Sequence, residues 1–201
     1  MNYIEILNNG KNFLKKNKIK NPILDSELLL SKVLNKSREE ILLNSNYILK
    51  KQEINTFNNY LLRRKYNEPI AYILGFKYFW KYKFITNKSV LIPRPDTELI
   101  VEECLKYLPN NKSKKILDIG TGSGCIIISI LKERSKCIAT ALDLSNRALN
   151  VAKSNAKLHQ LENKINFINI DIDKYKSYNY DLIISNPPYI NSVDFNRLED
   201  D

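Results

Sequence analysis

The sequence has few of the residues on which metal sites, disulfide frameworks and histidine-based mechanisms depend. Its 201 residues include three cysteines and one histidine. Cys104, Cys125 and Cys137 are odd in number and form no CxxC pair, so we expect neither a metal site nor a disulfide framework. His159 lies in a predicted helix, and we interpret it as a surface or packing residue. A catalytic triad or a Cys-His pair is therefore not favoured.

Long apolar runs are also lacking. No apolar stretch approaches the roughly 20 residues that span a bilayer, and residues 1–10 lack the basic start and apolar centre of a secretory signal. Hydrophobic residues make up 43% and charged residues 27% of the chain, which is typical of a globular protein. We therefore expect a cytoplasmic protein that has no membrane partner.

Positive charge is concentrated at the front of the chain. The formal net charge is +10, and residues 1–66 hold 13 Lys and Arg against 6 Asp and Glu, whereas residues 67–201 hold 19 against 16. Such a basic segment could meet nucleic acid, a ribosome-associated particle or an acidic protein. Lys, Asn and Ile are abundant throughout, however, so a general bias in composition explains the excess equally well.

Three stretches of different character follow one another. Residues 1–66 carry apolar residues at helical spacing, which predicts a small helical bundle, with Asp25 capping one of its helices. Residues 67–95 open with a helix-breaking proline and continue with aromatic and β-branched residues, which predicts a β-hairpin that links two domains. Residues 96–201 open with Asp96, which is predicted to cap a helix, and form the third part.

From Lys115 onward, short apolar strands alternate with helices. Strands are expected at Ile116–Ile119, Cys137–Leu142, Ile165–Ile170 and Leu182–Ser185, and helices at Ile126–Leu131 and Arg147–His159. This alternation predicts an α/β fold with a parallel sheet covered on both faces. Ligands of such sheets bind at the carboxyl ends of the strands. The fourth strand lies close to the last residue, Asp201, and we expect its edge to be exposed.

A glycine-rich loop, Gly120-Thr121-Gly122-Ser123-Gly124, follows the first of these strands. Glycine lets the backbone turn tightly and approach a ligand closely. A dinucleotide-binding fingerprint would need a further glycine where Cys125 stands. The loop is therefore predicted to hold a smaller adenosyl ligand that has no pyrophosphate, rather than a nicotinamide or flavin cofactor.

Acidic residues end the next two strands. Asp143 lies 23 positions after Gly120 and can accept hydrogen bonds from both hydroxyls of a ribose. Asp171 ends the third strand, where its carboxylate or the adjacent backbone could bind an adenine amine. Asp173 could do this instead. The side chain of Leu142, next to Asp143, is expected to pack in the interior of the protein.

The fourth strand runs into Asn186-Pro187-Pro188-Tyr189, which suits a planar nitrogen acceptor. The lone pair of an amide or aromatic amine is delocalised, so the nitrogen is a poor nucleophile and must be aimed. The Asn186 side-chain oxygen and the Pro187 carbonyl can each accept one of its N–H groups. The two prolines stiffen the backbone, and the Tyr189 ring can stack on the planar group. No acid–base pair is needed.

These residues together resemble class I S-adenosylmethionine-dependent methyltransferases that act on amino groups. Glu68–Gly75, Leu91–Glu98 and the helical front narrow the resemblance to the HemK/PrmC family. That family methylates the side-chain amide of the glutamine in the Gly-Gly-Gln motif of peptide chain release factors. The resemblance implies a Rossmann-like sheet whose C-terminal strands are absent from this chain. Two local departures stand out: Lys81 stands where the family usually has glycine at the hairpin turn, and Asn191 stands where aspartate is common.

The resemblance implies a role for each site residue. The donor, S-adenosyl-L-methionine, would be bound by Gly120, Thr121, Gly122, Ser123, Gly124 and Asp143, with Asp171 and Ile172 flanking its adenine. Asn186 would touch donor and substrate, Pro187, Pro188 and Tyr189 would hold the glutamine, and Asn186, Pro187 and Tyr189 would be catalytic. Residues 1–66 would then recognise the substrate, residues 67–95 would be the linker, and residues 96–201 would form an incomplete donor-binding domain.

Two other functions stay open. An amino-methyltransferase that acts on an exocyclic amine of RNA or DNA could use the same pocket on a flipped base, although the helical segment has no recognisable nucleic-acid motif. A non-catalytic fragment that only holds the donor is the third possibility. The expected partner is a release factor, direct binding of nucleic acid is not favoured, and we expect a monomer.

Overall fold

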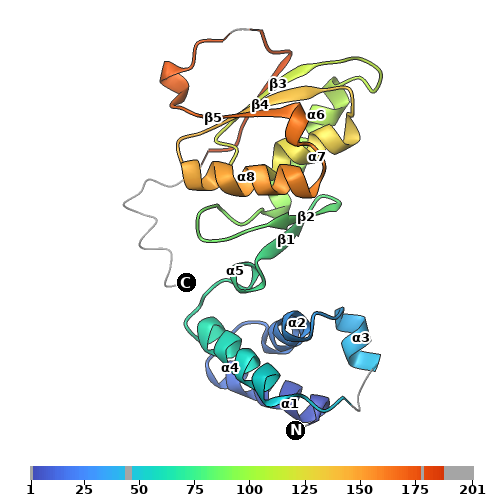
Figure 1. Ribbon diagram of the computed structural model, residues 1–201, viewed down its shortest axis with the longest axis vertical. Helices are drawn as coiled ribbons and strands as arrows, with labels where there is room; N and C mark the ends of the chain where they lie inside the picture. Colours follow the sequence, from blue (N-terminus) through green and yellow to red (C-terminus); the bar gives the residue numbers. More distant parts are fainter. Residues whose placement is uncertain (1, 44–46, 178, 188–201) are drawn as a thin grey trace. The chain divides into compact units, whose positions relative to one another are not determined.

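The structure is a computed structural model that describes residues 2–43, 47–177 and 179–187 (Figure 1). The chain divides into two compact units, residues 1–76 and residues 77–201. Within the described ranges, no helix is both long and apolar enough to cross a membrane.

The first unit is helical, as predicted. Its helices are α1 (Tyr3–Lys16), α2 (Pro22–Leu34), α3 (Arg38–Leu43), α4 (Lys51–Lys65) and α5 (Ile70–Leu74). Leu14, Leu29, Leu30 and Phe57 are almost completely buried at its centre. The short helix α5 was not expected, because it lies in the stretch that was interpreted as hairpin alone.

The prediction that Asp25 caps a helix is wrong. The helix α2 begins at Pro22, three residues earlier, because proline at a first helical position already has the required φ and needs no N–H partner. Asp25 therefore lies inside the helix, where it is 4% exposed and accepts a hydrogen bond from Arg64 Nε at 2.8 Å. Its carboxylate forms an ion pair with Arg64 and does not cap the backbone N–H groups at the start of the helix.

The predicted β-hairpin of β1 (Phe76–Phe79) and β2 (Tyr82–Ile85) lies at the start of the second unit, apart from Phe76, which is the last residue of the first. Its tip is bound by Glu133, whose Oε1 accepts hydrogen bonds from the Trp80 indole at 3.0 Å, Lys81 Nζ at 2.9 Å and the Tyr82 hydroxyl at 3.2 Å. In the turn, the residue with a left-handed backbone conformation is Trp80, whose φ is 55°, and not Lys81. A side chain at position 81 is therefore tolerated, and it adds an ion pair.

The centre of this unit is a parallel sheet of β3 (Lys115–Ile119), β4 (Ile138–Asp143), β5 (Ile165–Asn169) and β6 (Leu182–Ser185). The strand order is β5-β4-β3-β6. The chain places β4 and then β5 on one side of β3, and β6 on the other side. Between strands run α7 (Cys125–Glu133) and α8 (Asn146–Leu158), and α8 packs against β4 and β5 (Figure 1). The predicted α/β, Rossmann-like arrangement is confirmed. Its topological switch point lies between β3 and β6, where such sheets bind ligands.

One face of the sheet holds the main core. Ile116 pairs with Ala139 and Leu182 in the strand register, and Ile184 lies two residues beyond Leu182 on the same face. Ile116, Ala139 and Ile184 pack with residues of α6 (Glu98–Tyr107), α7 and α8. On the opposite face Ile183 is 61% exposed. The expectation that helices cover both faces is therefore not met at β6.

The prediction that Asp96 caps a helix is also wrong. Pro95 starts a short 3-10 helix, η1 (Pro95–Thr97), which runs directly into α6. Asp96 lies inside η1, and Thr97 takes the N-cap position of α6. As at Pro22, proline brings the start of the helical segment forward.

Candidate active site

A cavity of about 530 Å³ opens at the carboxyl ends of the strands. Its walls are residues 89–94 with Thr97, the loop after β3 (residues 119–123) with Cys125 and Ile126, the ends of β4 and β5 (142–145 and 170–172) with Ala148, and Asn186 with Pro187. These stretches surround the switch point between β3 and β6. The size is within the usual range of small-molecule sites.

The glycines of the loop after β3 have two different tasks. Gly120 and Gly122 have φ of 71° and 56°, in the left-handed region, and a β-carbon at Gly120 would meet no protein atom within 4 Å. Backbone conformation and room for a ligand, rather than packing, therefore favour glycine there. At Gly124 a β-carbon would come 3.0 Å from Ile128 Cδ1 and 3.3 Å from Ala152 Cβ. Gly124 is absent from the cavity wall and permits close packing of α7 on α8.

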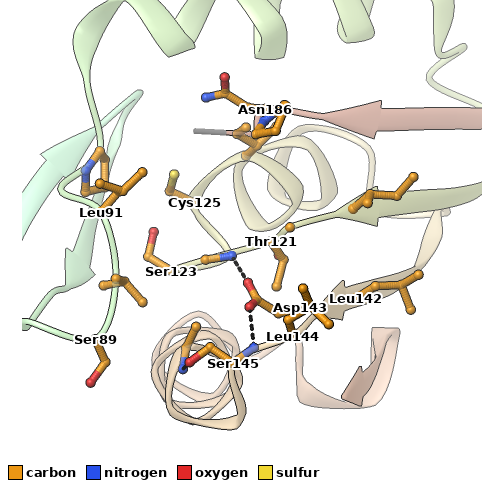
Figure 2. Close-up of a pocket in the computed structure, with 18 of the residues that line it drawn as sticks. Ser89, Leu91, Thr121, Ser123, Cys125, Leu142, Asp143, Leu144, Ser145 and Asn186 are labelled. Carbon is orange, nitrogen blue, oxygen red and sulfur yellow. Dashed lines mark hydrogen bonds between the residues drawn. The ribbon is translucent and has the colours of Figure 1, made fainter. Parts of the chain in front are cut away.

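The loop is held in place by the end of β4. The N–H groups of Gly120 and Thr121 donate to the Leu142 carbonyl at 2.9 and 3.0 Å. The Gly122 N–H donates to Asp143 Oδ2 at 2.9 Å, and the Ser145 N–H donates to Asp143 Oδ1 at 2.8 Å (Figure 2). Each oxygen of this carboxylate thus accepts one backbone hydrogen bond and retains a further lone pair for a ligand. Leu142 is buried as expected, and it also lines the cavity.

Asp118 is part of this arrangement and was missed in the sequence. It lies on β3 with 2% exposure, and the Thr121 hydroxyl donates to its Oδ2 at 2.6 Å. Burial raises the pKa of Asp118 to about 6. The negative charge of Asp143 nearby also raises this pKa, whereas the hydrogen bond from Thr121 lowers it. The available signal was a carboxylate inside an otherwise apolar strand, since a buried charge needs a partner.

The residues predicted near an adenine lie at the end of β5. Asp171 and Ile172 both line the cavity, whereas Asp173 does not. One oxygen of Asp171 accepts the backbone N–H of Asp173 at 3.1 Å, which starts the 3-10 helix η3 (Ile172–Lys174). Asn169 Nδ2 donates to the carbonyls of Asp143 and Leu144 at 2.9 and 2.8 Å, which joins the ends of β4 and β5.

Asn186 lies at the end of β6, on the other side of the loop from Asp143 (Figure 2). Its backbone follows Ser185, which pairs with Ile119 and donates its hydroxyl to the Ile119 carbonyl at 3.2 Å. The Asn186 side-chain nitrogen donates to Thr97 Oγ1 at 3.3 Å. Pro187 also lines the cavity, and Pro188 and Tyr189 lie outside the described residues.

Residues 89–94 form a wall that sequence reasoning did not assign to the site. Ser89 and Leu91 lie across the cavity from the strand ends (Figure 2). Pro93 and Pro95 restrict the backbone of this segment. The two prolines were visible in the sequence, but nothing in their spacing pointed to the strand ends.

The chemistry available in the cavity is that of binding and orientation. Cys125 lines the cavity, but burial raises its pKa to about 12, so it is a neutral thiol. Among the residues that the structure describes, no group of three His, Cys, Asp or Glu could hold a metal ion. Polar backbone groups and carboxylates lie at one end and a carboxamide at the other. This combination can hold an adenosyl ligand and orient a planar nitrogen beside it.

Comparison with protein families gives two matches. The model described as "PrmC N-terminal domain" matches residues 5–75, and the one described as "Methyltransferase small domain" matches residues 97–197. Together they cover most of the chain, in the order helical unit and sheet unit.

Curated proteins with similar sequences carry related names. A release factor glutamine methyltransferase of Buchnera aphidicola is 37% identical over 195 residues, which are 94% of this chain and 70% of the relative. One of Fusobacterium nucleatum is 36% identical over 198 residues, 97% of this chain and 56% of the relative. A bifunctional methyltransferase of Rickettsia typhi is 42% identical over 205 residues, 92% of this chain and 40% of the relative. The chain thus spans about half the length of the last two.

Proposed function

Because the chain belongs to the family of release factor glutamine methyltransferases, we propose that it transfers a methyl group from S-adenosyl-L-methionine to a glutamine side-chain amide of a peptide chain release factor. The glutamine would be that of the Gly-Gly-Gln motif. One observation carries the proposal: Asp143 and Asn186 line the two ends of one cavity, with the glycine loop between them.

The donor would lie along the glycine loop. The Asp143 carboxylate, already oriented by Gly122 and Ser145, would accept hydrogen bonds from the ribose hydroxyls. Asp171 and Ile172 would flank the adenine, and Thr121 and Ser123 would contact the remainder. S-adenosyl-L-methionine supplies an electrophilic methyl group on a sulfonium, whose positive charge disappears on transfer, so a water-poor cavity favours the reaction.

The substrate amide would be oriented by Asn186 and Pro187. The Asn186 side-chain oxygen and the Pro187 carbonyl would each accept one N–H of the glutamine amide, which aims the nitrogen lone pair at the methyl group. Pro188 and Tyr189 would complete the clamp, with the tyrosine ring stacked on the amide. The nitrogen gains the methyl carbon and loses one proton, which passes to water. These residues act by position, so no histidine or lysine base is required.

The helical unit would contribute to substrate docking. It carries 13 Lys and Arg against 6 Asp and Glu in residues 1–66, a balance that attracts an acidic surface of a protein. A protein that modifies translation factors would act in the cytoplasm, and we propose that it does so as a monomer.

A labelling experiment tests this proposal. The chain is incubated with S-adenosyl-L-methionine labelled on the methyl group and with purified release factor, total RNA or DNA. We expect label on the release factor, and none on a release factor in which the glutamine of the Gly-Gly-Gln motif is replaced by alanine. Label on RNA or DNA would support an amino-methyltransferase of nucleic acid instead. Donor binding without any labelled product would leave only a donor-binding role.

A further inference from the structure

We propose that Thr97 is a positioning residue that fixes the side-chain carboxamide of Asn186 for methyl transfer. The inference rests on the proposed function, because it gives Asn186 the task of orienting the substrate amide. Thr97 lies upstream of the sheet, 89 residues before Asn186, and no acceptor-orienting role follows from its own position in the sequence.

The geometry that carries the proposal is one hydrogen bond at the cavity wall. Asn186 Nδ2 donates to Thr97 Oγ1 at 3.3 Å, and both residues line the cavity. A carboxamide turns readily about its last side-chain torsion. A bond at the nitrogen restricts that rotation, and in the proposed orientation the oxygen is the atom that meets the substrate N–H groups. An Asn186 amide turned the other way would present its own N–H groups to those of the substrate.

The Thr97 hydroxyl is not used as a helix cap. Thr97 is the N-cap residue of α6, where threonine commonly accepts a hydrogen bond from a backbone N–H of the first helical turn. Here its side chain makes no such bond, because η1 runs into α6 and Thr97 has helical dihedrals, φ −68° and ψ −17°. The hydroxyl meets Asn186 instead. Removing it should therefore cost little helix stability.

Neighbouring residues hold Thr97 in place. Glu98, the next residue, accepts the backbone N–H of Trp80 at 2.7 Å, which ties the start of α6 to the hairpin tip. Glu133 on α7 binds the same tip through the Trp80 indole at 3.0 Å. A group that orients another must itself be held by packing and hydrogen bonds. The start of α6 meets this condition.

The contact itself is tested without any turnover. The chain is labelled with nitrogen-15 in asparagine side chains, and the Asn186 amide signals are identified by their loss in Asn186→Ala. We expect Thr97→Val, which keeps the shape but removes the hydroxyl, to move these signals, and Thr97→Ser to leave them near their original positions. Unchanged Asn186 signals in Thr97→Val would overturn the contact and with it the proposal.

The role in transfer is tested by kinetics on release factor. We expect Thr97→Val to lower kcat by about 10- to 100-fold, as for a misaligned reacting group, with donor affinity and melting temperature close to those of the parent. Thr97→Ser should recover most of the rate. If the parent chain labels no release factor, the proposed function fails. If the parent is active and Thr97→Val has the same kcat, the positioning role alone fails.

Discussion

The cavity has a proposed donor end, formed by the glycine loop and Asp143, and a proposed acceptor end, formed by Asn186, Pro187 and Thr97. The two ends are built in different ways. At the donor end, Gly120, Thr121 and Gly122 are each held by a backbone or carboxylate oxygen of Leu142 or Asp143 at 2.9 to 3.0 Å. At the acceptor end, the hydrogen bond from Asn186 Nδ2 to Thr97 Oγ1 is longer, at 3.3 Å. The donor end comes from one continuous strand–helix–strand stretch, whereas the acceptor end joins residues that are 89 positions apart.

This difference implies that the two functions of the cavity can be separated. The donor end is preorganised by neighbouring strands, so its variants should change affinity for the donor. In the proposed function the acceptor end orients a second molecule, so its variants should change the rate of transfer much more than the affinity for the donor. Variants at each end therefore test whether donor affinity and the rate of transfer can be changed separately.

The largest effect is expected at Asn186. Asn186→Ala removes the carboxamide that would orient the substrate, and we expect the rate of methyl transfer to fall by about 100- to 1000-fold, as when a preorganised polar group is removed from an active site. Donor affinity, measured by titration calorimetry, should fall by no more than about tenfold, the effect of losing the single contact that Asn186 would make with the donor. A variant that retained the parent rate would show that Asn186 does not orient the amide.

The next effect is expected at Asp143. Asp143→Ala removes the acceptor of the Gly122 N–H and the proposed acceptor of the ribose hydroxyls. Loss of two hydrogen bonds to a charged group should weaken donor binding by about 100-fold or more. Glu102→Ala, on the exposed surface of α6, is the matched control and should bind the donor as the parent does. Equal affinity in Asp143→Ala and Glu102→Ala would contradict the donor assignment.

Asp118 should make the free energy of unfolding depend on pH. Its folded-state pKa of about 6 lies above the value of about 4 in an unfolded chain, so the folded state binds the proton more tightly. Its contribution to stability therefore falls as pH rises from about 4 to about 6, and is constant above that range.

This sensitivity can be measured with Asp118→Asn, which keeps an acceptor for the Thr121 hydroxyl but cannot ionise. The free energy of unfolding, from urea titrations between pH 4 and pH 7.5, should shift in favour of the variant by about 3 kcal/mol over that range. A difference between variant and parent that does not depend on pH would mean that Asp118 has an ordinary pKa.

The smallest effect is expected at the hairpin tip that supports Thr97. Glu133→Ala removes the acceptor of Trp80, Lys81 and Tyr82. Since the Lys81 side chain is 63% exposed, we expect a loss of only about 1–2 kcal/mol in the free energy of unfolding. Lys106→Ala, which breaks exposed ion pairs on α6, is the control and should change stability by less than about 0.5 kcal/mol. Equal stability of the two variants would show that Glu133 does not hold the tip.

The donor end could be predicted from the sequence because its parts are local. Alternating strands and helices predicted the parallel sheet, and Gly120, Gly122 and Asp143 follow from strand ends that must lie together. Gly124 was assigned to the donor through the family resemblance, and this assignment stays a prediction. Its nearest neighbours, Ile128 and Ala152, indicate in addition that it permits close packing. Asp118 was missed because a single carboxylate inside a strand has no spacing pattern.

The acceptor end could be predicted only in part. The position of Asn186 after β6 followed from the strand pattern, but its contact with Thr97 depends on how the start of α6 is held by the hairpin. The proposed caps at Asp25 and Asp96 failed for a related reason. Pro22 and Pro95 begin helical segments ahead of these acidic residues, so the residue type that usually caps a helix lies inside the segment instead.

The central claim is that the acceptor end of the cavity orients a glutamine amide for methylation. Mass spectrometry of release-factor peptides, after incubation with S-adenosyl-L-methionine and either the parent chain or Asn186→Ala, tests it most directly. We expect one added methyl group on the side-chain nitrogen of the Gly-Gly-Gln glutamine with the parent, and at equal incubation times about 100-fold less of it or lower with Asn186→Ala. A methyl group on another residue, or equal methylation by both chains, would contradict it.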